Sequence, residues 1–182
     1  MKFRLILTLF FISIYYIGQA QLYSYKNLNH QSGLNYGAIN CINQSEDGFI
    51  WIGTDGGELV RYNGETFKEI KFKNSIDNHH YNSIYCRGDQ VLFSSFYKGF
   101  YQYSNATEKL EVLAKNSDKF GRALSVFRDD STTYLIGSKA ILKKSGGETT
   151  ELKKFNDEKS LDTVYQLIDA GNFFILTTSK GN

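Results

Sequence analysis

Four short apolar runs recur along the chain at a nearly constant interval. Each begins with three apolar residues and ends on small or hydroxyl-bearing ones, and the runs cover 50–54, 91–95, 134–138 and 174–178. The separations between their closing residues are 41, 43 and 40, and these residues are Thr54, Ser95, Ser138 and Thr178. Self-similarity at such a period is typical of a repeat architecture, so the chain is best interpreted unit by unit.

Further strand-like segments flank these runs. An apolar segment precedes each run, at 38–42, 83–86, 124–127 and 164–168. Two segments follow each of the first three runs, the second being the more polar, at 59–62 and 66–70, 100–103 and 109–113, and 141–144 and 149–153. The dipeptides between them supply the positive φ of tight turns, as in Asp47-Gly48, Gly56-Gly57, Asn63-Gly64 and Gly146-Gly147. No long window has helical periodicity.

The pattern predicts an all-β fold, a β-propeller of four-stranded antiparallel blades. Inner strands are apolar on both faces because each blade lies between two others, whereas the charged outer strand faces solvent. The predicted units span 37–72, 81–114, 122–155 and, with two strands only, 162–182; the alternating segment 22–28 is predicted to be a further outer strand. A seven-bladed ring would need roughly 290 residues at this period. We therefore expect an incomplete N-terminal part of a larger ring, which needs further blades and self-associates without them.

The first twenty residues form a separate segment. A short positive head, Lys2 and Arg4, precedes thirteen apolar residues, and small residues stand three and one positions before Gln21. This is the layout of a secretory signal peptide with cleavage after Ala20, and the apolar stretch is too short for a comfortable membrane span. The mature chain, 21–182, is therefore expected to be exported.

Charge and motifs narrow the expected partners. A net charge of +2 does not by itself exclude nucleic-acid binding, but the sequence has no basic run of the kind that a phosphate backbone would need, so no nucleic-acid partner is expected. No Cys/His spacing suits zinc, and no cofactor motif is present, so neither metal nor cofactor is expected. Cys41 and Cys86 both lie in apolar strand-like segments, and whether they form a disulfide or remain separate thiols stays open.

The segment 47–64 contains the only tryptophan and is the clearest copy of the repeat. Trp51 is interpreted as a core residue between adjacent blades, because its counterparts in the other units, Leu92, Leu135 and Ile175, are apolar. The alternative, that Trp51 stacks on a sugar or a base, has less support. Glycine at 53 indicates close approach of another backbone.

This segment resembles the two-component regulator propeller repeat. The residues that carry the resemblance, all with structural roles, are Asp47, Gly48, Trp51, Gly53, Thr54, Gly57, Leu59, Tyr62 and Gly64. The resemblance implies a periplasmic sensor propeller of a bacterial regulator, often a glycan sensor, that continues into more blades, a β-sandwich, one membrane span and an output module such as a histidine kinase. It also implies pairing of two receptors. Units two and three depart from the motif, for instance at Leu92 and Lys144.

Three functions are compatible with this pattern: a non-catalytic ligand sensor, a protein-interaction scaffold and a glycan-active enzyme. The adjacent acids 129–130 and 157–158 lie in predicted turns, and no nucleophile motif is present, so a sensor without catalysis is preferred. Ligands of propellers commonly sit on the face formed by the loops that enter the innermost strands. The candidate ligand-face residues there are Asn35, Tyr36, Asn40, His80, Tyr81 and Arg122.

Overall fold

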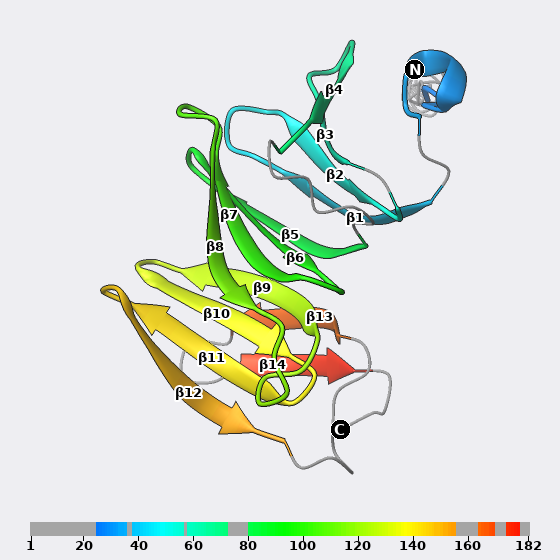
Figure 1. Cartoon of the computed structure of the whole chain (residues 1–182). Coiled ribbons are helices and arrows are strands. Elements are labelled where there is room, and N and C mark those ends of the chain that lie inside the picture. Colours follow the sequence, from blue (N-terminus) through cyan, green and yellow to red (C-terminus); the bar gives the residue numbers. More distant parts are fainter. Residues whose placement is uncertain are drawn as a thin grey trace, which may run out of the picture.

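The computed structural model describes residues 25–35, 38–56, 58–72 and 80–155, and the backbone of two later strands. The described strands form three four-stranded antiparallel sheets and one two-stranded sheet, each a simple meander (Figure 1). Their bounds are β1 Ile39–Gln44, β2 Ile50–Thr54, β3 Leu59–Tyr62 and β4 Phe67–Ile70; β5 Tyr81–Arg87, β6 Gln90–Ser95, β7 Gly99–Ser104 and β8 Lys109–Lys115; β9 Ala123–Asp129, β10 Thr132–Gly137, β11 Ala140–Ser145 and β12 Glu148–Lys154; β13 Val164–Asp169 and β14 Phe174–Thr178.

The sheets follow one another in chain order like successive blades of a propeller (Figure 1). The first strand of each sheet lies beside the first strand of the next, so β1, β5, β9 and β13 line the inner side of the arc. The described sheets do not close into a ring. This architecture confirms the predicted all-β fold with four-stranded antiparallel blades.

A β-bulge recurs at the same place in all four sheets. The extra residue lies near the start of each inner strand, at Asn40, Asn82, Leu124 and Tyr165. The bulges are spaced by 42, 42 and 41 residues, which is more regular than the spacing of 41, 43 and 40 between the closing residues of the apolar runs. Bulges bend a strand and redirect the residues beside it. Each inner strand is therefore bent at the same height, next to the loop that enters it.

The strand register corrects the predicted alignment of the third unit by one residue. Trp51 pairs with Asn43, Leu92 with Tyr85 and Tyr134 with Phe127, so the counterpart of Trp51 in the third sheet is Tyr134 rather than Leu135. A slip of one residue moves a side chain to the opposite face of a sheet. Consistently, Leu135 packs toward the second sheet. The sequence alignment matched Ser138 with Thr54 and Ser95 because all three carry a hydroxyl. In the structure, Gly137 occupies the position in β10 that Thr54 and Ser95 occupy in β2 and β6.

The core between the first and second sheets is aromatic. Trp51 is 1% exposed, and its ring meets that of Tyr103 edge-on with the centroids 6.0 Å apart. The indole Nε1 donates a hydrogen bond of 3.2 Å to Ser45 Oγ, which satisfies its one polar group. Phe72 and Phe93, stacked with centroids 5.8 Å apart, belong to the same cluster. The structure thus places Trp51 between two blades.

Three side chains around Gly53, at the interface between the first and second sheets, are larger than their equivalents at the interface between the second and third sheets. A Cβ at Gly53 would lie 2.5 Å from Cys41 Sγ and 2.7 Å from Tyr81 Cβ, with Ile84 also close. The register makes Ser94 the counterpart of Gly53 in the second sheet. The counterparts of its three neighbours are all smaller: Ser83 for Cys41, Ala123 for Tyr81 and Val126 for Ile84. Ser94 Oγ accordingly fits, and it donates a hydrogen bond of 3.0 Å to the Leu124 carbonyl.

Both cysteines are free thiols in the described structure. They pack against the core between the first two sheets. Burial raises the pKa of each thiol from 9.0 to about 12. Because the thiolate is the reactive form, Cys41 and Cys86 behave as apolar packing groups at neutral pH.

The motif residues of the first blade hold its turns. Gly48, at a φ of 88°, closes the turn after β1, where Ser45 Oγ donates a hydrogen bond to the carboxylate of Asp47. Thr54 Oγ1 donates to the Glu58 carbonyl at 3.1 Å, and Tyr62 donates to the Gly64 carbonyl. Leu59 is fully buried. Gly57 lies outside the described residues.

The N-terminal segment covers the outer face of the first sheet. Leu28 and Leu34 pack on Ile52, Val60 and Tyr62 beside a short 3-10 helix, η1 His30–Ser32, which Asn29 caps. In the predicted outer strand 22–28, residues 25–28 are not in a strand, and 22–24 lie outside the described residues. Contacts of Leu28 and Leu34 with the first sheet hold this segment in place of strand pairing.

Candidate ligand-binding face

The loops that enter the inner strands and the loops after the second strands lie at the same end of each sheet. Three backbone hydrogen bonds join these two kinds of loop, one in each four-stranded sheet. Asp55 N–H donates to Ala38 at 3.1 Å, Phe96 to His80 at 2.8 Å, and Ser138 to Arg122 at 2.9 Å. Ala38, His80 and Arg122 are spaced by 42 residues each and precede β1, β5 and β9. They are therefore equivalent positions in three blades.

Side chains connect these equivalent positions across the blade boundaries. The carboxylate of Asp55 accepts a hydrogen bond from Nδ1 of His80, and the two atoms are 2.6 Å apart. The ring of His80 meets that of Phe96 edge-on, with centroids 5.6 Å apart. The guanidinium carbon of Arg122 lies 4.6 Å from the centroid of the same Phe96 ring. Phe96 thus contacts a histidine from its own blade and an arginine from the next blade.

Tyr97 completes this row of side chains. It is 61% exposed, although its ring packs edge-on against Phe96 with centroids 5.0 Å apart and against His80 at 6.1 Å. Its neighbours fix its position while one of its surfaces remains in solvent. Exposed aromatic rings held in this way are common anchors for ligands. We call Asp55, His80, Phe96, Tyr97 and Arg122 the loop ridge.

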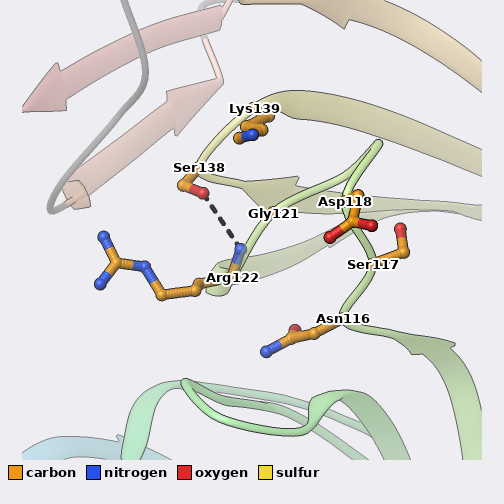
Figure 2. Close-up of a pocket in the computed structure, with 7 residues that line it drawn as sticks. All are labelled: Asn116, Ser117, Asp118, Gly121, Arg122, Ser138 and Lys139. Atoms are coloured by element: carbon orange, nitrogen blue, oxygen red, sulfur yellow. Dashed lines mark hydrogen bonds between the residues drawn. The ribbon is translucent and has the colours of Figure 1, made fainter. Parts of the chain in front are cut away.

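A hollow of about 430 Å³ lies beside the ridge and shares Arg122 with it (Figure 2). This volume falls within the usual range for small-molecule sites. Its lining is polar and comes from the loop before β9 and the loop after β10: Asn116, Ser117, Asp118, Gly121, Arg122, Ser138 and Lys139. Figure 2 shows the Arg122 side chain extending to one side, with Ser117 and Asp118 on the other.

Gly121 and Ser138 approach each other closely in the wall of this hollow. Gly121 has a φ of 81°, and a Cβ there would lie 2.1 Å from Ser138 Oγ, so only glycine fits. The same Ser138 Oγ accepts a hydrogen bond of 3.0 Å from the Arg122 N–H, the dashed line in Figure 2. Asn116 joins the hollow to the ridge, because its side chain donates to the Phe96 carbonyl at 2.8 Å and accepts from Ala123 N–H at 3.0 Å.

The six ligand-face residues expected from the sequence have different positions. His80 and Arg122 meet on Phe96, as described above. Asn40 is exposed at the first bulge, whereas Asn35 donates a hydrogen bond of 3.0 Å to Glu69 on the outer strand β4. Tyr36 lies outside the described residues.

Tyr81 was expected on the ligand face, but the structure places it in the core. Its side chain is 0% exposed and packs edge-on against Phe93 with centroids 5.5 Å apart, and burial raises the pKa of its hydroxyl. It is the first residue of β5, directly after His80, and successive residues of a strand point to opposite sides. Asp55, Phe96 and Tyr97 were not expected at this face from the sequence, although each follows one of the repeated strands 50–54 and 91–95.

Of the acids considered for catalysis, Asp130 has a positive φ of 41° in the turn after β9, is largely exposed, and forms an ion pair of 3.0 Å with Arg87. Asp157 and Glu158 lie outside the described residues. Among the residues that are described, no group of three or more His, Cys, Asp or Glu side chains could hold a metal ion. In the same part of the chain, no helix has the length and hydropathy to cross a bilayer.

Solved structures share this fold at low sequence identity. The extracellular domain of BT4673 of B. thetaiotaomicron, a protein assigned as a one-component system, matches 80% of this chain with 16% identity and a TM-score of 0.61. The extracellular domain of BT3049 of B. thetaiotaomicron, assigned as a hybrid two-component system, matches 86% with 15% identity and a TM-score of 0.50. The computationally designed Ika4 protein matches 90% with 11% identity and a TM-score of 0.59.

These likenesses concern the fold. The chain spans 20% of the BT4673 domain, 29% of the BT3049 domain and 94% of Ika4. No protein-family model matches the sequence, and no curated protein matches it. Extracellular domains of bacterial signalling proteins are thus among the structures with the same fold.

Proposed function

We propose that this chain is an exported, non-catalytic ligand-binding segment of a bacterial two-component-type receptor, and that the loop ridge and its hollow bind the ligand. The observation that carries the proposal is the convergence of two blades on Phe96, which holds His80 and Arg122 on one ring beside the exposed Tyr97. The fold shared with extracellular domains of signalling proteins supports this placement.

A site that lies across a blade boundary suits a sensor. The hydrogen bond from His80 to Asp55 crosses from the first to the second sheet, and the Arg122–Phe96 contact crosses from the second to the third. A ligand that touches Tyr97 and Arg122 together would therefore favour one relative position of two sheets. Such a difference in binding free energy between two arrangements is what a receptor needs to transmit a signal.

Binding without turnover is the expected result for this face. When purified protein is incubated with a panel of oligosaccharides, ligand-observed NMR should detect binding that Tyr97→Ala weakens about tenfold, since an aromatic contact contributes roughly 1–1.5 kcal/mol. Chromatography of the same samples should recover every oligosaccharide uncleaved. Tyr25→Ala is the matched control, because Tyr25 is 92% exposed.

Cleavage products that disappear when Asp129 or Asp130 is replaced would assign the protein to the enzymes instead. Binding that Tyr97→Ala and Tyr25→Ala weaken equally would exclude the loop ridge as the ligand site.

Export gives a second test. The intact mass of protein recovered from a periplasmic extract should correspond to a chain that begins at Gln21, because the small residues before it fit signal peptidase. Recovery of a chain that retains residues 1–20 would contradict this proposal. Ala20→Lys should block cleavage and serves as the mass standard for the uncleaved form.

A further inference from the structure

We infer that the ligand of the loop ridge carries a carboxylate on a hydroxylated ring, and that Arg122 binds this carboxylate while Tyr97 stacks on the ring. The inference rests on the proposed function, because it specifies the chemistry of the same site. A hexuronate is the simplest compound of this class.

The Arg122 guanidinium is held in a position in which it can bind an anion. One face of its guanidinium lies on Phe96, 4.6 Å from the ring centroid, and this stacking limits the freedom that the side chain would lose on binding. Among the residues that the structure describes, Arg122 forms no ion pair, whereas Arg87, Lys119 and Lys144 each contact an acid. The N–H groups along its edge are thus free to form the two parallel hydrogen bonds that match a carboxylate.

Tyr97 adds a flat surface next to this cation. Its ring is edge-on to both Phe96 and His80, so two neighbours fix its plane while 61% of the residue stays exposed. The apolar face of a sugar ring can stack on such a surface. The Tyr97 centroid lies 5.0 Å and the Arg122 guanidinium carbon 4.6 Å from the centroid of the same Phe96 ring, so a ligand about 10 Å long can touch both.

The hollow supplies partners for hydroxyl groups. Ser117, Asp118 and Lys139 also line it, and Figure 2 shows Ser117 and Asp118 on the side opposite to the direction in which the Arg122 side chain extends. The carboxylate of Asp118 accepts hydrogen bonds from hydroxyls but repels a second carboxylate. A ligand with a single acidic group and several hydroxyls therefore fits the distribution of charge better than a compound with several acids does.

A matched pair of sugars tests the inference. D-glucuronate and D-glucose differ only at C6, and ligand-observed NMR with the purified protein should give a dissociation constant for glucuronate at least tenfold below that for glucose. Arg122→Gln should weaken glucuronate binding by about 10- to 100-fold, as expected for loss of a charge-assisted bidentate contact, and weaken glucose binding by a much smaller factor. Arg122→Lys should restore only a part, because lysine keeps the charge without the planar fork.

Lys119→Gln is the matched control for charge. It removes one positive charge from the same loop, but Lys119 contacts Glu151 at 3.6 Å and does not line the hollow. Thermal unfolding of each variant should show an unchanged midpoint, because both side chains are exposed. An equal loss of glucuronate binding in Arg122→Gln and Lys119→Gln would overturn the inference, since the effect would then be one of net charge.

Other outcomes separate this inference from the proposed function. Equal binding of glucose and glucuronate, both weakened by Tyr97→Ala, would overturn the carboxylate and leave the ligand face intact. Tighter binding of glucose 6-sulfate than of glucuronate would likewise overturn the assignment of a carboxylate. Binding of these sugars that neither Tyr97→Ala nor Arg122→Gln affects would overturn both proposals.

Discussion

Trp51→Ala is expected to lower the free energy of unfolding by about 3–5 kcal/mol, the usual cost of truncating a large buried aromatic side chain. The indole is 1% exposed and fills the space between the first and second sheets, where it meets Tyr103. Its removal would leave a cavity that strands on both sides frame, so collapse around it is limited. The guanidinium carbon of Arg61, 5.9 Å from the Trp51 ring, would lose a stacking partner as well.

Urea denaturation followed by circular dichroism measures this loss. Tyr25→Ala provides the control and should change the free energy of unfolding by less than about 0.5 kcal/mol, because that residue is exposed. Trp51→Phe should recover a substantial part of the stability, since it keeps an aromatic ring but not the hydrogen bond to Ser45. Unchanged stability of Trp51→Ala, together with a loss of sugar binding, would instead make Trp51 a ligand contact.

Gly53→Ser is expected to cost about 1–3 kcal/mol, the range for forcing extra atoms into a packed core. The new Cβ would stand 2.7 Å from Tyr81 Cβ, an atom that moves only with its backbone. The serine at the equivalent position of the second sheet shows that the backbone itself accepts a side chain there. The cost should therefore arise from the neighbours and be measurable by the same denaturation experiment.

A double-mutant cycle tests that origin. In a Cys41→Ser, Tyr81→Ala, Ile84→Val background, which copies the three neighbours of Ser94, the added cost of Gly53→Ser should fall close to zero. The background variant is itself destabilised, so the comparison is the difference between the two Gly53→Ser costs. Equal costs in both backgrounds would show that the strain comes from the glycine backbone and not from side-chain size.

The fold was predictable from the sequence because strand length and period are local properties. Glycine-containing turns and a spacing near 41 residues suffice to indicate meandering blades. The alignment of the third unit was wrong by one residue because Ser138 resembles Thr54 and Ser95, whereas Gly137 holds their position in the strand register. The bulges at Asn40 and Asn82 left no signal that could be recognised, because an unpaired residue is defined by the partner strand and not by its own side chain.

The candidate site was predictable only in part. His80 and Arg122 stood at the entry to inner strands, which is a position that the repeat reveals. Phe96 brings them together, and this contact between blades depends on the angle at which sheets stack. Tyr81 was misplaced because its direction depends on where β5 begins, and a strand boundary is uncertain by more than the single residue that reverses a side chain.

The unequal side-chain sizes at the two blade interfaces also discriminate between correct and incorrect neighbouring blades. In a chain of similar units, a blade could stack on the wrong neighbour, within one molecule or between two, and misassembly of this kind is a characteristic failure of repeat proteins. Gly53 accepts an inner strand that carries a tyrosine, whereas Ser94 accepts one that carries an alanine. The second blade placed in the third blade's position would press Tyr81 against Ser94. Side-chain size therefore disfavours this exchange of the second and third blades, because two buried side chains would clash.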